Sequence, residues 1–353
     1  MKKNKFVLIL LLALSLLIVA CGSTDGGSGE DGKETELVLS TWGFNEELLR
    51  KNIYEPFEKE HNVKIVLEVG NNADRLNKIR MDNNVDVIQL AEGFTVQAIN
   101  EGLIEEINPD NIPNLEELYD FAKAPFGAQY GPSNTIDRFG IMYDSDQVDI
   151  DVDSWDDLWD DSLTKQVTIP DITTTSGPMI PYIAADIEGL DIKTDIDAVF
   201  NKIKALDDNL VKIYSKSSEV VNMFTQKEVA LVSGLGFAYG QIKEAVPTVK
   251  WVDPKEGSYA AMNSVNVVKG SKNKDLAEKF INWLISEEVQ KANAVDRVDS
   301  PANKTVVLTD EQAEGLAYGK ETIEKLNVVD WQYIYEVNKE WIDKWNKEIS
   351  GGN

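Results

Sequence analysis

The amino-acid sequence predicts an α/β protein built from two α/β units with a cleft between them. Strand and helix patterns alternate in the first third of the chain, and a second alternating stretch follows a region rich in Pro, Asn and Gly at 105–140. About 318 of the 353 residues follow a non-globular N-terminal segment, and that length suits two domains.

The N-terminal segment predicts export. Lys2, Lys3 and Lys5 precede an apolar run at 6–20, which is shorter than the roughly 20 residues that a membrane span needs. Positive residues followed by a short apolar run are typical of a signal peptide, which we assign to 1–20. The run ends in IVACG, and this ending resembles the lipobox of bacterial lipoproteins.

Cys21 is the single Cys of the chain, so an internal disulfide is excluded. The lipobox resemblance implies that Cys21 is diacylated and becomes the mature N-terminus, which places the protein on the outer face of the cell membrane. The alternative is an ordinary signal peptide with an incidental Cys. Residues 22–35 have no apolar side chain, so we expect 21–35 to be the lipidated Cys and a flexible tether.

The first unit has a βαβαβ pattern. Apolar strands are predicted at 37–41, 63–69 and 85–90, and helices at 46–60, 72–82 and up to Gly102. Asn45 is a candidate N-cap of the first helix, and Pro56 is a candidate kink. This order predicts parallel strands joined by right-handed crossovers.

The second unit starts from a strand at 139–143. Ser154 and Asp157 form a capping-box pattern, and Thr194 with Asp197 form another. Further elements are strands at 167–170, 229–233 and 249–252, a crossing strand at 262–269, and amphipathic helices at 274–284 and 333–349.

Ligands of open α/β sheets bind beyond the carboxyl ends of strands. Five segments follow predicted strands in this way: 41–44, 91–94, 171–177, 233–236 and 259–264.

Composition and motifs argue against catalysis and against nucleic acid. The net charge of −26 repels phosphates and attracts cationic solutes, or it reflects only a solvated acidic surface. His61 is the single His, and the chain has neither a phosphate-binding glycine loop nor a set of zinc ligands. We therefore expect no catalytic residue, metal or cofactor. The remaining enzyme hypothesis is a carboxylate-pair hydrolase using pairs such as Asp156 and Asp157.

The segment SWDDLWDDSL at 154–163 is similar to the SWxDLW segment of periplasmic spermidine/putrescine-binding proteins. Other segments match that family in the same order: STWGF at 40–44, EGLI at 101–104, KEG at 255–257 with MNS at 262–264, the 272–284 helix, SPAN at 300–303 and WQ at 331–332. The resemblance covers almost the whole mature chain.

This resemblance implies a two-lobed, type II periplasmic-binding-protein-like α/β fold with the ligand cleft between the lobes. Lobe 1 is expected to be 36–140 plus 263–305, and lobe 2 to be 141–262 plus 306–350. The implied function is the solute-binding component of an ABC importer: a monomer, not an enzyme, which captures a small molecule and delivers it to the membrane permease.

The resemblance and the strand-end segments together select the expected ligand-binding residues. These are Trp42, Phe44, Glu92, Phe94, Thr174, Thr175, Ser176, Tyr259, Asn263 and Gln332. Trp42 and Phe94 are the aromatic walls, and Glu92 is a candidate partner for a cation. Asn263 and the turn at 173–176 replace groups that grip ammonium in the family.

Two ligand classes therefore stay open. The family and the acidic charge favour a polyamine or a related small amine. The hydroxyl-rich turn at 173–176, expected at a helix N-terminus, suits an oxyanion, so the alternative is a zwitterionic or anionic metabolite resembling an amino acid or an aminophosphonate.

Overall fold

The computed structural model describes residues 35–81 and 84–350. The predicted signal peptide 1–20, Cys21 and nearly all of the predicted tether lie outside the described residues. Thr35, the last residue assigned to the tether, instead begins the first strand. Within the described part, no helix is both long and apolar enough to cross a membrane.

One nine-stranded sheet runs through the folded part. Its strand order is β2-β1-β3-β9-β4-β7-β5-β6, and β8 pairs with β4. The strands are β1 Thr35–Thr41, β2 Val63–Val69, β3 Val87–Ala91, β4 Ser133–Asp144, β5 Val167–Pro170, β6 Leu210–Tyr214, β7 Leu231–Leu235, β8 Val249–Val252 and β9 Tyr259–Val267. As predicted, β1 is parallel to β2 and to β3, and β5 is likewise parallel to β6 and β7.

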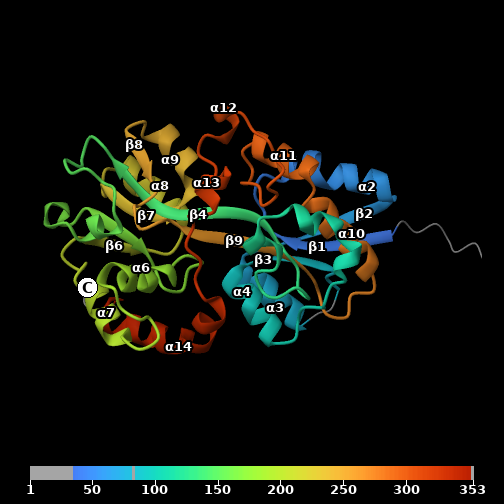
Figure 1. The fold of residues 1–353 in the computed structure, drawn as a ribbon, viewed down its shortest axis with the longest axis horizontal. Coiled ribbons are helices and arrows are strands. Elements are labelled where there is room, and N and C mark those ends of the chain that lie inside the picture. The colour runs from blue at the N-terminus through green and yellow to red at the C-terminus, as the bar shows by residue number, and fades with distance from the viewer. Residues whose placement is uncertain (1–34, 82–83, 351–353) are drawn as a thin grey trace, which may run out of the picture. The chain divides into compact units, whose positions relative to one another are not determined.

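Two long antiparallel strands join these parallel groups. One end of β9 pairs with β3 and the other end pairs with β4, while the far half of β4 pairs with β7. In Figure 1, β4 and β9 accordingly run through the centre of the sheet. The crossing strand predicted at 262–269 is β9, and the strand predicted at 139–143 is the second half of β4.

Helices cover the two groups of strands. They are α1 Glu46–Leu49, α2 Glu55–His61, α3 Asn72–Met81, α4 Glu92–Asn100, α5 Asp120–Lys123, α6 Met179–Glu188, α7 Ile196–Lys204, α8 Ser217–Thr225, α9 Tyr239–Ala245, α10 Lys274–Leu284, α11 Glu287–Val295, α12 Asp310–Ala313, α13 Lys320–Ile323 and α14 Trp331–Glu348. Large apolar cores form on both sides of the crossing strands. One contains Trp155, Trp341 and Trp345, and the other contains Phe57 and Phe280.

Helix boundaries differ from the predictions where backbone geometry overrides the residue pattern. The helix predicted at 46–60 is α1 and α2 joined by a π-helical turn at Arg50–Tyr54, and Pro56 lies in the first turn of α2, where its missing N–H costs no hydrogen bond. Asn45 has a left-handed backbone (φ 50°) and does not cap α1 with its side chain. The cap predicted at Thr194 is also wrong, because α7 begins at Ile196. The capping box of Ser154 and Asp157 is confirmed.

The close approach of the chain before β4 to β9 generates a stability prediction. A Cβ added at Gly131 would lie 1.8 Å from the carbonyl oxygen of Val265, and backbone cannot move aside cheaply. Gly131→Ala should therefore lower the free energy of unfolding by about 2–3 kcal/mol in urea denaturation. Gly240→Ala is the matched control, because its Cβ meets open space in α9 and Ala favours a helix. Equal stability of the two variants would contradict this account of the crossing.

Candidate ligand-binding cleft

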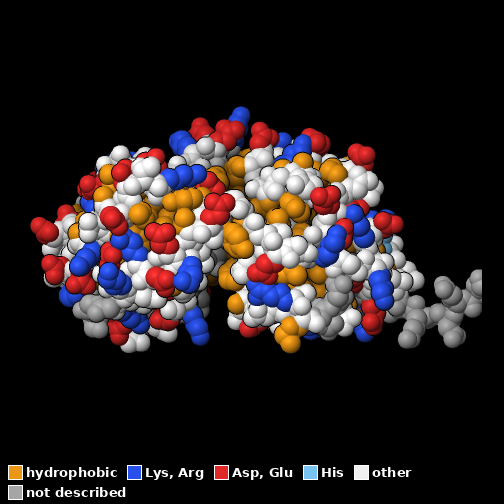
Figure 2. Space-filling view, turned by 90° about the horizontal axis from the view of Figure 1, so that it is seen from below, with side chains coloured by type: hydrophobic (Ala, Val, Ile, Leu, Met, Phe, Trp, Pro, Cys, Tyr) orange, Lys and Arg blue, Asp and Glu red, His pale blue; other side chains and the backbone are white. Residues whose placement is uncertain are grey.

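A cleft of about 760 Å³ lies along the crossing strands, within the size range of small-molecule sites of ~300–1,000 Å³. Its lining comes from the turn after β1, the end of β3, the first half of β4, the middle of β9, the turn after β5, and the segments after β6, β7 and α11. Phe44 and Phe237 line it from the β1 and β7 sides, and both rings are largely exposed. The face drawn in Figure 2 likewise shows hydrophobic side chains gathered along its middle.

The floor of the cleft is the stretch where the first half of β4 pairs with β9. Thr135 pairs with Asn263 in the antiparallel register, and the Asn263 amide donates a 3.0 Å hydrogen bond to the Thr135 hydroxyl. Asp137 lies two residues further along β4. Because alternate residues of a strand share a face, Thr135 and Asp137 project from the same side of the sheet, toward the ligand space.

Trp42 is one wall of the cleft, with its ring half-buried. Behind it lies the guanidinium of Arg75, whose central carbon is 4.1 Å from the centre of the Trp42 ring. Arg75 is buried and does not line the cleft. The guanidinium holds one face of the ring, so the cleft side of Trp42 is positioned to stack on a solute.

Asp137 places a carboxylate in the cleft beside the segment that follows β7. The amide N–H groups of Arg138 and Phe237 donate to its two oxygens at 2.8 and 3.1 Å. Desolvation raises the pKa of Asp137 to about 6, although these amides oppose the shift.

Asp299, after α11, lines the same cleft. Desolvation, and secondarily the negative charge of Asp137, raise its pKa to about 7. Within the described part of the chain neither acid forms a salt bridge, and Asp299 has no hydrogen-bond partner. Two carboxylates thus face one cleft without a salt bridge among the described residues, although the charge of Arg138 opposes the rise in the pKa of Asp137, and Lys216 and Arg297 also line the cleft. No cluster of three or more His, Cys, Asp or Glu suited to a metal occurs among the residues described.

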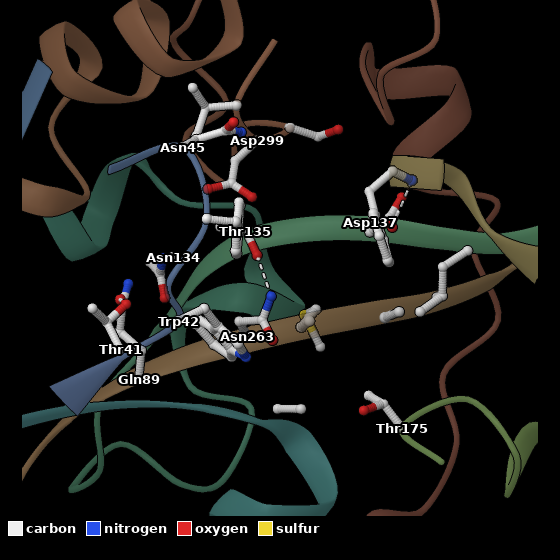
Figure 3. Close-up of a pocket in the computed structure, with 18 of the residues that line it drawn as sticks. Thr41, Trp42, Asn45, Gln89, Asn134, Thr135, Asp137, Thr175, Asn263 and Asp299 are labelled. Atoms are coloured by element: carbon white, nitrogen blue, oxygen red, sulfur yellow. Dashed lines mark hydrogen bonds between the residues drawn. The ribbon is translucent and has the colours of Figure 1, made fainter. Parts of the chain in front are cut away.

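The turn at 173–176 lines the cleft from the β5 side. The hydroxyls of Thr173 and Thr174 bond to Asp171 within the turn, at 2.5 and 2.8 Å. Across the described residues no hydrogen bond engages the amide N–H groups of Thr175 and Ser176 or the Thr175 hydroxyl, and Figure 3 shows Thr175 at the cleft. These groups are available to a polar group of the solute.

Seven of the ten residues expected from sequence line the cleft: Trp42, Phe44, Phe94, Thr174, Thr175, Ser176 and Asn263. Six of them follow the carboxyl ends of β1, β3 and β5, in agreement with the rule used to choose them, whereas Asn263 lies within β9.

Glu92 does not line the cleft, so its expected role as a cation partner is not supported. It is the first residue of α4 and is 2% exposed, and its carboxyl accepts a 3.0 Å hydrogen bond from the Met262 amide. Burial raises the pKa of Glu92 to about 8, while Met262 and the indole of Trp331 oppose the shift. The side chain therefore points under β9, where it is mostly protonated near neutral pH.

Tyr259 and Gln332 also lie elsewhere. Tyr259 is buried in the core, and its hydroxyl donates to the carboxylate of Asp186. Gln332 is exposed in the first turn of α14, where its side-chain oxygen accepts a 3.0 Å hydrogen bond from Asn100 of α4. The motifs that contain Tyr259 and Gln332 therefore contribute to packing within the fold and not to the lining of the cleft.

Sequence reasoning missed the two acids of the cleft and the buried amide Asn134. The strand predicted at 139–143 begins six residues earlier, which moves Asn134 and Asp137 from an irregular region onto the cleft floor. A lone acid between Ile136 and Phe139 was the available signal. Asp299 directly precedes the SPAN turn that carried part of the family resemblance.

Comparison with known proteins places the chain among transport proteins. Residues 52–319 match the family model described as bacterial extracellular solute-binding protein. A crystal structure of an ABC transporter from Clostridium perfringens is 42% identical, with a TM-score of 0.83, and the match covers 89% of this chain and 99% of that one.

Curated relatives carry names that state a ligand. The putrescine-binding periplasmic protein SpuD of Pseudomonas aeruginosa is 22% identical over 81% of this chain and 83% of its own length. The spermidine/putrescine-binding periplasmic protein of Escherichia coli is 25% identical over 69% of this chain and 72% of its own. Together with the matching structure, they confirm the predicted two-lobed fold and the family resemblance.

The raised pKa of Asp299 predicts that replacing this acid with a neutral residue increases the free energy of unfolding, by an amount that depends on pH. A folded-state pKa above the unfolded value of about 3.9 means that stability falls as pH rises from about 4 to about 7. The ligand-free Asp299→Asn variant should therefore be more stable than the wild type at about pH 8, by about 1–2 kcal/mol after allowance for solvent screening, and the gain should vanish toward pH 4.

Urea denaturation at several pH values measures this difference. Asp149→Asn is the control, because Asp149 is exposed in the loop after β4 and away from the cleft lining. Its effect should stay within about 0.5 kcal/mol at every pH. If Asp299→Asn were less stable than the wild type at about pH 8, burial of the ionised Asp299 carboxylate would not destabilise the fold, and this account would be wrong.

Proposed function

We propose a ligand class and an anchoring mode for this chain from one premise: the chain belongs to the bacterial extracellular solute-binding proteins. It is the solute-binding component of an ABC importer, and its relatives are transport proteins rather than enzymes. Its site must therefore bind a small molecule reversibly and release it unchanged to a permease.

The ligand we propose is a small solute that carries an amine. The observation that carries this proposal is the pair Asp137 and Asp299, two partly desolvated carboxylates that face one cleft and form no salt bridge within the described residues. An ammonium group placed at these acids would replace the water they have lost and would favour their ionised forms. Trp42, Phe44 and Phe237 supply apolar surface for the carbon chain of the solute.

A polyamine is the first candidate, because two relatives are named for putrescine and spermidine. A zwitterionic or anionic amine is the second. The turn that contains Thr175 and Ser176 favours this second candidate. Their backbone N–H groups form no hydrogen bond among the described residues, and N–H groups of a turn at the cleft can bind an oxyanion. Both candidates share the ammonium site.

We further propose the lobe division expected from sequence, 36–140 plus 263–305 and 141–262 plus 306–350, with the crossing strands β4 and β9 as the connection. We propose a monomer that acts on the outer face of the cell membrane. The two apolar cores support the division for most of the chain, but Ala317 and Ile323, assigned to lobe 2, pack in the core of lobe 1.

Calorimetric titration with putrescine, spermidine, amino acids and aminophosphonates tests the ligand class. Binding of an amine should weaken by about ten- to a hundredfold in Asp137→Asn and in Asp299→Asn, because each removes a charge-assisted contact of about 1.5–3 kcal/mol. Asp149→Asn, which removes an acid away from the cleft lining, should bind like the wild type.

The recovered ligand should have an unchanged mass. Amine binding that ignores both cleft acids would refute the proposed site. Steady conversion of the ligand would instead revive the carboxylate-pair hydrolase.

The anchoring mode we propose is diacylation of Cys21, as its lipobox-like surroundings suggest. Cys21→Ala should abolish the diacyl mass on the N-terminal peptide of the mature protein, measured by mass spectrometry. Ser23→Ala is the neighbouring control and should keep the lipid. A wild-type mature N-terminus without lipid would rule out the anchor.

A further inference from the structure

A buried cation stands behind the aromatic wall of the cleft. Arg75 on α3 is 2% exposed, and its guanidinium lies against the Trp42 ring. Its N–H groups donate to the side-chain oxygen of Asn72 at 2.9 Å and to the backbone oxygen of Asn71 at 3.3 Å. They also donate to the backbone oxygens of Ser40, at 3.5 Å, and Gln89. Arg75 thereby ties the ends of β1 and β3 to α3.

All of these acceptors are uncharged. Arg75 forms no ion pair within the described residues, whereas Arg80 on the same helix pairs with Glu101 at 2.6 Å. Burial lowers the pKa of Arg75 to about 9, so the group stays charged at neutral pH. The wall at Trp42 therefore carries a net positive charge a few ångströms behind the ligand surface.

This charge opposes a second cation on the free face of Trp42. An ammonium stacked there would lie roughly 8 Å from the guanidinium, twice the observed 4.1 Å separation. At an effective dielectric constant of about 20, the repulsion at that distance would weaken binding on the order of thirtyfold. A carboxylate or a neutral polar group would not be repelled.

An independent observation marks the same end of the cleft as a binding position for a polar group. Asn134 lines the cleft and is 3% exposed, yet its side-chain oxygen has no hydrogen-bond partner among the described residues. An unpaired buried acceptor is costly, so a solute that donates a hydrogen bond to it gains affinity. Thr41 and Gln89 close this end with a mutual hydrogen bond of 2.6 Å.

Asp137 lies apart from this wall. Figure 3 shows Asp137 away from the group formed by Trp42, Thr41, Gln89 and Asn134, with Asp299 drawn beside Asn45 and Thr135, between Asp137 and that group. The cleft thus has carboxylates at Asp137 and Asp299 and a buried positive charge behind Trp42.

We propose that the bound solute carries a single ammonium group, held at Asp137 and Asp299, and presents to the Trp42 wall backed by Arg75 either a carboxylate or an uncharged group that donates a hydrogen bond to Asn134. This inference rests on the proposed amine-binding function and narrows its substrate class. A diamine of similar length is selected against.

Matched ligands that differ only at one end test the inference. Diamines of three to five carbons, putrescine among them, are compared by calorimetry with the ω-amino acids and amino alcohols of the same lengths, such as 4-aminobutyrate and 4-amino-1-butanol. In the wild type, the tightest amino acid or amino alcohol should bind at least about tenfold more tightly than the diamine of its length.

Arg75→Met removes the buried charge and should reduce this preference to within about threefold. Arg80→Met is the matched control on the same helix and should leave the preference unchanged. If Arg75→Met does not fold, the wild-type ligand comparison alone decides.

A diamine that binds as tightly as its partners in the wild type overturns the inference, and so does a preference that survives in folded Arg75→Met. In either case the proposed function stands if binding still depends on Asp137 and Asp299. Absence of binding by every amine in the series overturns both proposals together.

Discussion

The antiparallel pairing of β4 with β9 is the constraint on which the rest of this structure depends. Each strand belongs at one end to a parallel group with its own core, and the paired middle is the stretch where residues of both groups meet. Thr135, Asp137 and Asn263 project from that stretch, so the floor of the cleft is made by the connection itself. The approach of Gly131 to the Val265 carbonyl shows how closely the chain before β4 follows β9.

Partial desolvation distinguishes the acidic side chains of the cleft from the other acids of the chain. The chain has 61 acidic side chains and a net charge of −26. If Asp137 and Asp299 were fully exposed to water, nothing would distinguish their carboxylates from the others. Burial disfavours their charged forms in the cleft, and the buried guanidinium of Arg75 places a positive charge behind Trp42. Long-range charge steers the association of a solute, whereas contacts within a closed site govern its dissociation.

Prediction succeeded where a local pattern decides the outcome. Short apolar, β-prone runs located β1, β2 and β3, and turns at strand ends supplied Trp42 and Thr175 to the cleft. It failed at Glu92, which also follows a strand, because its side chain turns under β9 and bonds to the Met262 amide. The direction of a side chain at a strand end depends on which segment packs over it, and the local sequence does not contain that segment.

The α/β class, the two-unit organisation, the family resemblance and the lack of a His- or Cys-based catalytic set can be read from the chain alone, because they rest on periodicity, ordered motifs and composition. Which acids line the cleft depends on how distant segments pack together. Asp137 and Asp299 are 162 positions apart in the sequence. The negative charge of Asp137 nevertheless raises the pKa of Asp299, because β4 and the segment after α11 line the same cleft. Desolvation, which gives a carboxylate its affinity for an ammonium, depends on the surrounding protein and has no signature in the sequence.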